Sequence, residues 1–254
     1  MKERLERRVL GAVRWVDAVT GHSVTQPLAI DAPDLRLVRN GAGLEVVTHA
    51  RGLETHESGF DLETLPPDQQ VPELSIELEG AVRDPAERYL PRRFTLRLPR
   101  VASPVRLANG RRPANSLFDP VEIGLLPGPS APVAASWTQI RVSARDAGGQ
   151  PLPDLYLRLV TSDGSAVLGR GMTDRRGEGL VMVAGLKLFA PGDTPQEVTT
   201  SRTLARLEAV VPGAGPRPVD WTALDGQPAT AANRLAIELQ AGRTYAIPYP
   251  FSGP

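Results

Sequence analysis

Apolar and polar residues alternate along much of this chain, and the alternation predicts short β-strands. It is most regular between residues 137 and 186, where the runs 140–144, 155–159 and 180–183 are each bounded by Gly, Pro or Asp. A repeat of two residues puts every second side chain on the same face of a strand. We therefore expect antiparallel strands of a β-sandwich in this stretch.

Turn signals separate these runs. Asp163-Gly164 is the pair that a tight hairpin favours, because both central residues of such a turn need positive φ. The sequence T-D-R-R-G at 173–177 predicts a second turn, in which the Asp174 side chain accepts backbone N–H groups and Gly177 takes the left-handed position.

The order of these parts also resembles a known family. D-x-x-G-x-P-L-x-x-x-x-L-x-L begins at Asp146, and it is followed by D-G, by G-x-T-D-x-x-G-E from Gly171, and by V-x-V-x-G-L from Val181. This order resembles the carboxypeptidase regulatory-like family, a transthyretin-like β-sandwich, over about fifty residues. The resemblance implies a non-catalytic module that stiffens, spaces or attaches another part. No peptidase domain for such a module to accompany is evident in the sequence.

The rest of the chain has the same short-strand character. Further strands are predicted at 9–16, 35–38, 44–48, 74–78, 94–98, 117–125, 235–239 and 245–247. Asn40-Gly41 predicts a hairpin turn, whereas 52–72 and 190–200 predict exposed loops. Residues 201–211 fit a helix by the spacing of their apolar positions, but the neighbouring strands favour a strand.

A proline-rich segment divides the chain. We expect an N-terminal β-sandwich domain at 1–126, a semi-rigid linker at 127–136 and a transthyretin-like or immunoglobulin-like domain at 137–254. The fold class is then all-β, with two antiparallel β-sandwich domains in tandem. The segment 16–30 echoes 145–157, so either the two domains are related repeats or the echo is a chance recurrence of Pro-Leu after a turn.

The amino-acid composition excludes several classes of function. The 254 residues include 25 Pro and 24 Gly, and 29 basic residues balance 29 acidic ones, so no net field favours nucleic acid or an anionic membrane. Absence of Cys excludes disulfides, thiolate metal sites and a thiol nucleophile. Arg14 and Asp17 interrupt the apolar run near the N-terminus, and no stretch is long enough to span a membrane. We expect cytoplasmic synthesis without a signal peptide, with a released particle as one destination.

No catalytic, cofactor or metal motif is found. His49 and His56, with Glu54 and Glu57 nearby, match no metal spacing and are better explained by a solvated loop. The segment 21–25 has Thr where a nucleophile elbow needs its second Gly, and no phosphate-binding Gly-rich loop occurs. We therefore expect a protein that is not an enzyme and that holds no cofactor or metal.

The most basic region is 88–112, and it supplies the candidate partner-binding residues Arg88, Arg92, Arg93, Arg97 and Arg100, followed by Arg106, Arg111 and Arg112. An exposed strand of alternating charge is the alternative explanation. The expected function is that of a structural or adaptor protein with protein partners in a larger assembly. The layout of the whole chain resembles accessory proteins of phage-tail-like contractile injection systems. The alternative is a module that binds a carbohydrate or another surface polymer, although packing roles are expected for Trp15, Trp137 and Trp221.

Overall fold

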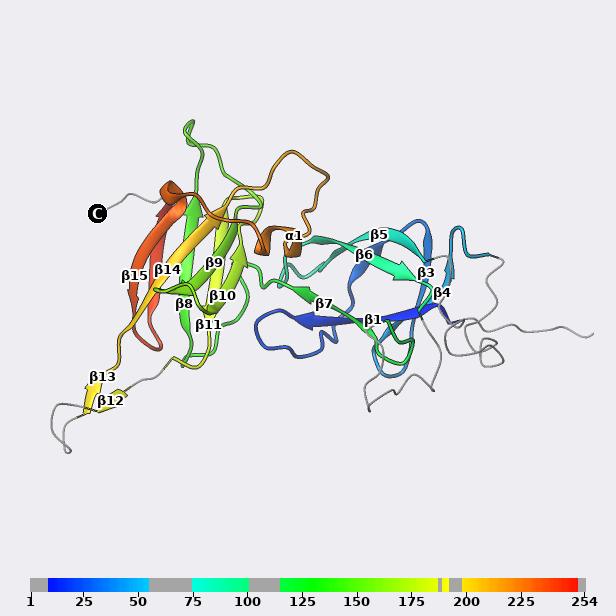
Figure 1. Ribbon diagram of the computed structural model, residues 1–254, viewed down its shortest axis with the longest axis horizontal. Coiled ribbons are helices and arrows are strands. Elements are labelled where there is room, and N and C mark those ends of the chain that lie inside the picture. Colours follow the sequence, from blue (N-terminus) through cyan, green and yellow to red (C-terminus); the bar gives the residue numbers. More distant parts are fainter. Residues whose placement is uncertain (1–8, 55–74, 101–114, 187–188, 192–197, 251–254) are drawn as a thin grey trace, which may run out of the picture. The chain divides into compact units, whose positions relative to one another are not determined.

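The computed structural model describes residues 9–54, 75–100, 115–186, 189–191 and 198–250. The chain forms two compact units, each built from several segments (Figure 1). Unit 1 comprises Met1–Val16, His22–Val82 and Arg93–Gly124, and unit 2 comprises Asp17–Gly21, Arg83–Arg92 and Leu125–Pro254. Strands make up nearly all of the regular structure, which confirms the all-β fold class.

Unit 1 contains two small sheets. The first has the order β3-β4-β1-β7, from β1 (Gly11–Asp17), β3 (Leu35–Arg39), β4 (Glu45–Ala50) and β7 (Val121–Leu125). The second has the order β2-β5-β6, from β2 (Ala29–Asp31), β5 (Ile76–Arg83) and β6 (Arg92–Leu98). β4 pairs with both β1 and β3 in antiparallel register.

The core of unit 1 contains an aromatic pair. Trp15 on β1 and Phe94 on β6 meet edge to face, with ring centroids 5.3 Å apart. The Trp15 indole N–H is buried and has no hydrogen-bond partner among the described residues. Leaving such a donor unpaired costs about 1–3 kcal/mol, which burial of the large ring must offset.

The predicted hairpin at Asn40-Gly41 is present between β3 and β4, but its turn differs from the expectation. The Asn40 side-chain oxygen accepts the N–H groups of Ala42 and Leu44. Gly43, rather than Gly41, takes positive φ, at 78°. The side chain of Asn40 therefore organises a longer turn than a two-residue loop.

Unit 2 is a two-sheet sandwich, the architecture that the family resemblance implies. One sheet has the order β10-β9-β14-β15, from β9 (Tyr156–Thr161), β10 (Val167–Met172), β14 (Thr203–Val210) and β15 (Arg234–Leu239), all antiparallel. The other has the order β11-β8-β16, from β8 (Thr138–Ala144), β11 (Glu178–Val183) and β16 (Thr244–Tyr249). β8 pairs antiparallel with β11 and parallel with β16.

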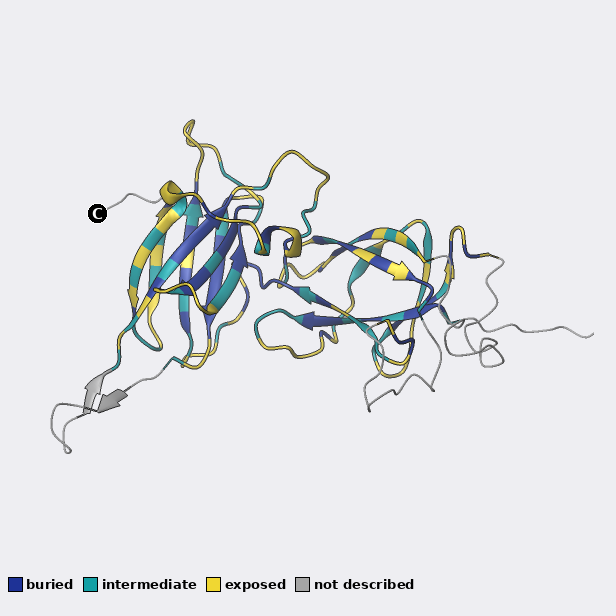
Figure 2. Cartoon of the chain, in the orientation of Figure 1, coloured by how far each residue is buried: buried dark blue, intermediate teal, exposed yellow. Residues whose placement is uncertain are grey.

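The core of unit 2 lies between these sheets. Alternate residues of β8, β9, β11 and β14 point inward, and they include Ile140, Val142, Leu157, Leu159, Val181, Val183 and Leu207. These strands are largely dark blue in Figure 2. The alternation seen in the sequence thus corresponds to the inward faces of the sandwich.

The two predicted turns of unit 2 are present. Gly177 has φ of 76°, and a Cβ at this position would lie 2.3 Å from the Ala144 carbonyl oxygen, so only glycine fits. The Asp174 carboxylate accepts N–H groups from Arg176 and Glu178, as expected. In the Asp163-Gly164 turn only Gly164 has positive φ. That turn is therefore not the tight type in which both central residues are left-handed.

The expected linker at 127–136 is packed onto unit 2. Ala131 is buried against Leu180 and Met182 on the outer face of the β11 sheet, and Trp137 packs beside it. The Gly128 N–H donates to the Arg88 carbonyl oxygen at 2.7 Å. Prolines fix φ in this segment, but they do not keep it away from a sheet that exposes apolar side chains. The segments 17–21 and 83–92, expected in the N-terminal domain, also belong to unit 2.

Several short elements were not expected. The segment 190–200, predicted as a loop, overlaps the antiparallel pair β12 (Phe189–Pro191) and β13 (Val198–Thr200). The strand β10, the helix α1 (Thr222–Asp225) and a 3-10 turn at Ala231–Asn233 were also missed. The ambiguous segment 201–211 forms β14, as favoured. Within the described ranges, no helix has the length and apolarity needed to cross a membrane.

Candidate functional site

A cleft of about 550 Å³ opens within unit 2. Its walls come from the segments 83–91, 129–130, 153–154, 173–176 and 217–218, all of which belong to this unit. The lining contains the prolines Pro85, Pro91, Pro129, Pro153 and Pro218, with charged residues and Tyr89 between them. Prolines have fixed φ and no N–H group, so these walls are stiff and offer few backbone donors.

The first wall, residues 83–91, is organised by Asp84. This buried carboxylate accepts the backbone N–H groups of Ala86, Arg88 and Tyr89 at 2.9–3.3 Å. The Tyr89 hydroxyl donates to Asp17 at 3.0 Å, and burial together with the charge of Asp17 raises the pKa of Tyr89 to about 12. This wall therefore holds its shape through its own hydrogen bonds.

The second wall consists of 153–154 and the turn at 173–176. Asp154 has φ of 60° and donates its N–H to the Thr173 carbonyl oxygen. Its carboxylate lies 3.4 Å from the Arg217 guanidinium, and burial raises the pKa of Asp154. Glu87 on the first wall has φ of 53°, so both non-glycine residues with positive φ in the described chain line the cleft. Backbone strain of this kind is concentrated at functional sites.

The charges of the cleft are unequally accessible. The side chains of Asp154 and Asp174 are 20% and 14% exposed, whereas those of Arg175, Arg176 and Arg217 are 83%, 65% and 47% exposed. Asp174 is already bonded to two backbone N–H groups and to Arg176. The cleft therefore presents guanidinium groups at its surface and keeps most of its carboxylates inside. We call Arg83, Arg175, Arg176 and Arg217 the rim arginines.

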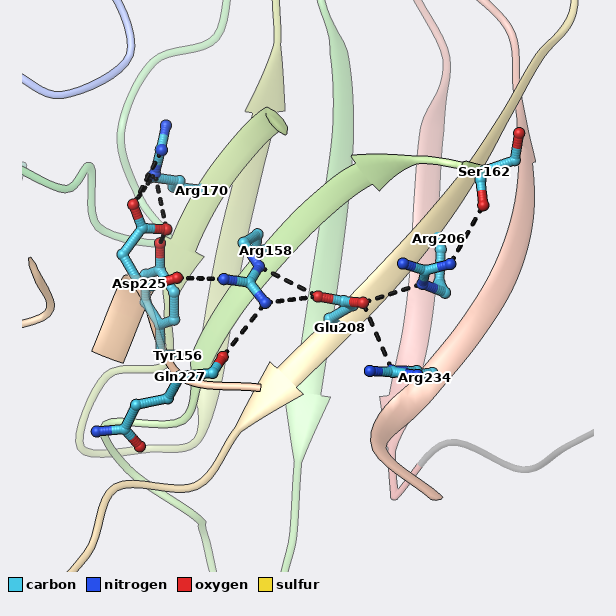
Figure 3. Close-up of polar contacts among 9 residues, drawn as sticks. All are labelled: Tyr156, Arg158, Ser162, Arg170, Arg206, Glu208, Asp225, Gln227 and Arg234. Carbon is cyan, nitrogen blue, oxygen red and sulfur yellow. Dashed lines mark hydrogen bonds and ion pairs between the residues drawn. The ribbon is translucent and has the colours of Figure 1, made fainter. Parts of the chain in front are cut away.

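An ionic ladder crosses the outer face of the four-stranded sheet (Figure 3). The sheet register aligns Arg170, Arg158, Glu208 and Arg234 in one row across β10, β9, β14 and β15. We call this row, together with Arg206 and Asp225, the ionic ladder. Like charges on neighbouring strands repel, so the row requires carboxylates between and beside its arginines.

Glu208 supplies the central negative charge of the ladder. Its side chain is 4% exposed and contacts Arg158 at 2.7 Å, Arg206 at 2.9 Å and Arg234 at 3.5 Å. Burial by itself would raise the pKa of Glu208, but hydrogen bonds from Arg158 and Arg206 outweigh it, and the net pKa is lowered. The Glu208 carboxylate is therefore ionised, and both of its oxygens are paired with neighbouring arginines.

Asp225 supplies the second negative charge and fixes helix α1. Arg170 binds this carboxylate through two nitrogens at 3.0–3.1 Å, and the Tyr156 hydroxyl donates to it at 2.6 Å. Arg158 also donates to the Asp225 carbonyl oxygen. Because Asp225 is the last residue of α1, these contacts hold the helix on the outer face of the sheet.

The helix in turn holds the first wall of the cleft. Trp221, which precedes α1, stacks on Tyr156 with an angle of 11° between the rings. The Arg92 guanidinium lies 5.2 Å from the centre of the Trp221 ring and forms an ion pair with Asp220. Arg92 follows the wall segment 83–91 directly. The ladder thus anchors the wall through helix α1. Its charged groups are bonded to one another and are not available to a ligand.

The candidate partner-binding arginines are divided between the two units. Arg88 and Arg92 belong to unit 2, whereas Arg93, Arg97 and Arg100 belong to unit 1. Arg92 is 4% exposed and packs internally, which corrects the expectation of an exposed charge there. Arg88 is exposed and lies in the first wall segment, although it is not among the residues that line the cleft.

The three arginines of unit 1 lie on or after β6. Arg93 pairs with Glu79, and Arg97 lies 3.7 Å from Glu77, both on β5. Arg100 is half-buried and donates to the Ser116 carbonyl oxygen, and burial lowers its pKa. Alternating charge on β6 is therefore matched by acidic residues on its neighbour. Three further candidates lie outside the described residues: Arg106, Arg111 and Arg112.

The rim arginines were not singled out by the sequence. Arg175 and Arg176 lie in the T-D-R-R-G turn, whose exposed position was a usable signal, since binding residues concentrate on loops. Arg83 and Arg217 carry no comparable signal, because they are brought to the cleft by segments far apart in the chain.

Two of the four residues weighed as metal ligands, His49 and Glu54, lie in the part of the chain that the structure describes. His49 is exposed on β4, and Glu54 accepts the Gly52 N–H, which lowers its pKa. His56 and Glu57 lie outside the described residues. Across the part of the chain that the structure describes, no three His, Asp or Glu side chains come together as metal ligands would. Trp15 and Trp221 are buried, as a packing role requires.

Comparison with known proteins gives distant matches only. No protein-family model matches the chain, and no curated protein matches it in sequence. Among solved structures, 5-hydroxyisourate hydrolase of Klebsiella pneumoniae is 15% identical, with a TM-score of 0.25, over 47% of this chain and 90% of that one. A streptococcal ancillary pilin is 13% identical, with a TM-score of 0.28, over 84% of this chain and 49% of that one.

A third match is the TIE protein of Bacillus anthracis, 8% identical with a TM-score of 0.26. The alignment covers 94% of this chain but only 33% of that protein. These are distant likenesses to pilin and transthyretin-like β-sandwich structures. Identities and scores this low transfer neither an activity nor a partner to this chain.

Proposed function

We propose that the protein is a non-catalytic structural or adaptor protein, and that unit 2 holds an extended, acidic segment of a partner protein in its cleft. The observation that carries this proposal is the unequal exposure of charge in the cleft. Asp174 is bonded to the cleft's own backbone, whereas the rim arginines Arg175 and Arg176 are largely exposed. An incoming carboxylate would find guanidinium donors that are still accessible.

The stiffness of the cleft supports the same proposal. Prolines line both walls, and Asp84 and Tyr89 fix the first wall through hydrogen bonds. A recess that is already formed loses little conformational freedom when it is filled, so a short segment can bind without reorganising the sandwich. Its volume of about 550 Å³ suits a few residues of chain rather than a folded domain.

Within this proposal the partner is another component of a larger assembly, such as the contractile injection particle that the layout of the chain resembles. Attachment through an extended segment requires only that the partner present carboxylates and apolar side chains at a terminus or in a loop. No feature of the cleft favours a carbohydrate over such a segment, since Tyr89 is its one aromatic side chain among the described lining residues.

Fluorescence anisotropy with two labelled peptides tests the proposal. An alternating Glu-Pro peptide of about eight residues should bind, and binding should weaken as salt is added, whereas a Lys-Pro peptide should not bind. Arg175→Glu combined with Arg217→Glu should weaken binding about tenfold or more, because both guanidinium groups line the cleft.

The matched control is Arg202→Glu. Arg202 is 64% exposed and pairs with Glu238 at 2.8 Å, so it resembles Arg175 in exposure and pairing but does not line the cleft. The control should bind the Glu-Pro peptide as the unaltered protein does. Equal binding of both peptides, or undiminished binding by the double variant, would refute the proposal.

A further inference from the structure

β16 is the last described strand and forms an edge of the three-stranded sheet (Figure 1, red). The Gln139 N–H donates to the Arg243 carbonyl oxygen, and the Arg145 N–H donates to the Tyr249 carbonyl oxygen. In a parallel ladder alternate residues bond to the same neighbour, so 243, 245, 247 and 249 face β8. The backbone groups of Thr244, Ala246 and Pro248 therefore point away from the sheet.

The strand β16 itself contains no charged residue, and Arg243 directly precedes it. Its outward-facing residues Thr244, Ala246 and Pro248 are exposed and neutral. Every other edge strand whose side chains the structure describes contains at least one charged residue, namely β2, β3, β6, β7, β10, β11 and β15. Charged residues on edge strands prevent pairing with other chains, so the absence of charge on β16 distinguishes it.

We infer that β16 pairs with β16 of a second copy of this chain, antiparallel and related by a two-fold axis at Ala246. In this register the Ala246 N–H groups of the two copies donate to each other's carbonyl oxygens. The Thr244 N–H of each copy donates to the Pro248 carbonyl oxygen of the other. Pro248 lacks an N–H, but here it serves only as an acceptor, so every outward N–H of the edge is bonded.

The side chains agree with the same register. On the inner face, Tyr245 and Ile247 are half-buried against the core, and the two-fold axis places Tyr245 of one copy opposite Ile247 of the other. Aromatic residues opposite β-branched residues are favourable cross-strand pairs. A register shifted by two positions on one strand would place Thr244 opposite Ala246 and shorten the overlap from five residues to three. The longer overlap buries more of the edge.

The proposed pair is independent of the cleft. None of the outward residues of β16 lines it. Arg141 on β8 is the nearest charged neighbour of Ala246 in the sheet register, and it is bonded to Gln139 and to the Pro129 carbonyl oxygen. An adaptor with one surface for itself and another for a partner would bring two partner segments together.

Introducing a charge at the two-fold axis tests the inference. Sedimentation velocity over about a hundredfold range of concentration should show a monomer–dimer equilibrium for the unaltered protein. Ala246→Lys and Ala246→Glu, each examined alone, should associate at least tenfold more weakly, because two like charges then face each other at the axis. Mixing the two variants should restore the dimer, and native mass spectrometry should show one copy of each.

The matched control is Ala236→Lys, which places the same charge on an exposed alanine of edge strand β15. It should associate as the unaltered protein does, and circular dichroism should show that all variants keep their fold. A protein that stays monomeric throughout, or a mixture of variants that fails to pair, would overturn the inference. Peptide binding in the cleft would be unchanged in every Ala246 variant, so the two proposals succeed or fail separately.

Discussion

The ionic ladder and the rim of the cleft use the same residue types in opposite ways. In the ladder, Glu208 is 4% exposed and contacts three arginines. At the rim, Arg175 and Glu87 are 83% and 73% exposed and lie 3.6 Å apart. A buried carboxylate cannot exchange its partners for water, whereas an exposed pair can separate at little cost. The ladder therefore stabilises the fold, and the rim is available for a ligand.

The largest loss of stability is expected for Glu208→Ala. This change leaves Arg158, Arg206 and Arg234 without their shared carboxylate, and it should lower the free energy of unfolding by about 3–5 kcal/mol. Urea unfolding measures the loss. Glu238→Ala is the control, since Glu238 is 44% exposed in its pair with Arg202, and it should cost about 1 kcal/mol or less. Equal losses would mean that the ladder is not structural.

A smaller effect is expected at Asp225, and it depends on pH. Burial would raise the pKa of Asp225, but hydrogen bonds from Arg170 and Tyr156 lower it below the ordinary value of 3.8. A lowered pKa contributes stability above pH 3.8 that is lost as the pH falls through the folded-state pKa. Asp225→Asn should therefore cost about 2–3 kcal/mol at neutral pH.

The difference between this variant and the unaltered protein should shrink on acidification, because the protonated carboxyl of Asp225 resembles the neutral amide. Urea unfolding at a series of pH values from neutral to about 3 checks this. Parallel stability curves for the two proteins would contradict the assigned role of the Asp225 charge.

The smallest effect is expected at the rim. Arg175→Ala removes an exposed arginine whose partner Glu87 is also exposed, so the free energy of unfolding should change by about 0.5 kcal/mol or less. The same urea measurement applies. A loss as large as that of the Asp225 variant would assign Arg175 to the support of the wall and would weaken the distinction between ladder and rim.

Much of the fold could be predicted because strand patterning is local. The alternation at 140–144 and 155–159 predicted β8 and β9, and the T-D-R-R-G turn predicted Gly177 in the left-handed region. β10 was missed because Gly169 and Gly171 replace the apolar residues of its inward face. These glycines are required where the backbone of β10 passes close to β11: a Cβ on Gly171 would lie 2.2 Å from the Leu180 carbonyl oxygen.

The candidate site could not be predicted in the same way. The run of arginines near residue 90 predicted a partner-binding surface. Arg92, however, is buried under Asp220 and Trp221, which lie about 130 residues further along the chain. Burial depends on which distant segment covers a side chain, and a local pattern carries no information on that. For the same reason the proline-rich segment 127–136 was predicted to be a linker, although it packs on Leu180 and Met182.

The amino-acid sequence was enough to predict the all-β class, the inward-facing residues of the strands, the principal turns and the absence of cysteine chemistry. Each follows from residues that are neighbours in the chain, whose spacing and φ preferences decide the result. The three-dimensional packing brings residues 83–91, 153–154, 173–176 and 217–218 together around one cleft. It also pairs the carboxylates of the ladder with arginines of the same sheet, while the rim arginines stay exposed. Those properties arise from contacts between distant segments, because burial and partner choice are set by packing rather than by chain order.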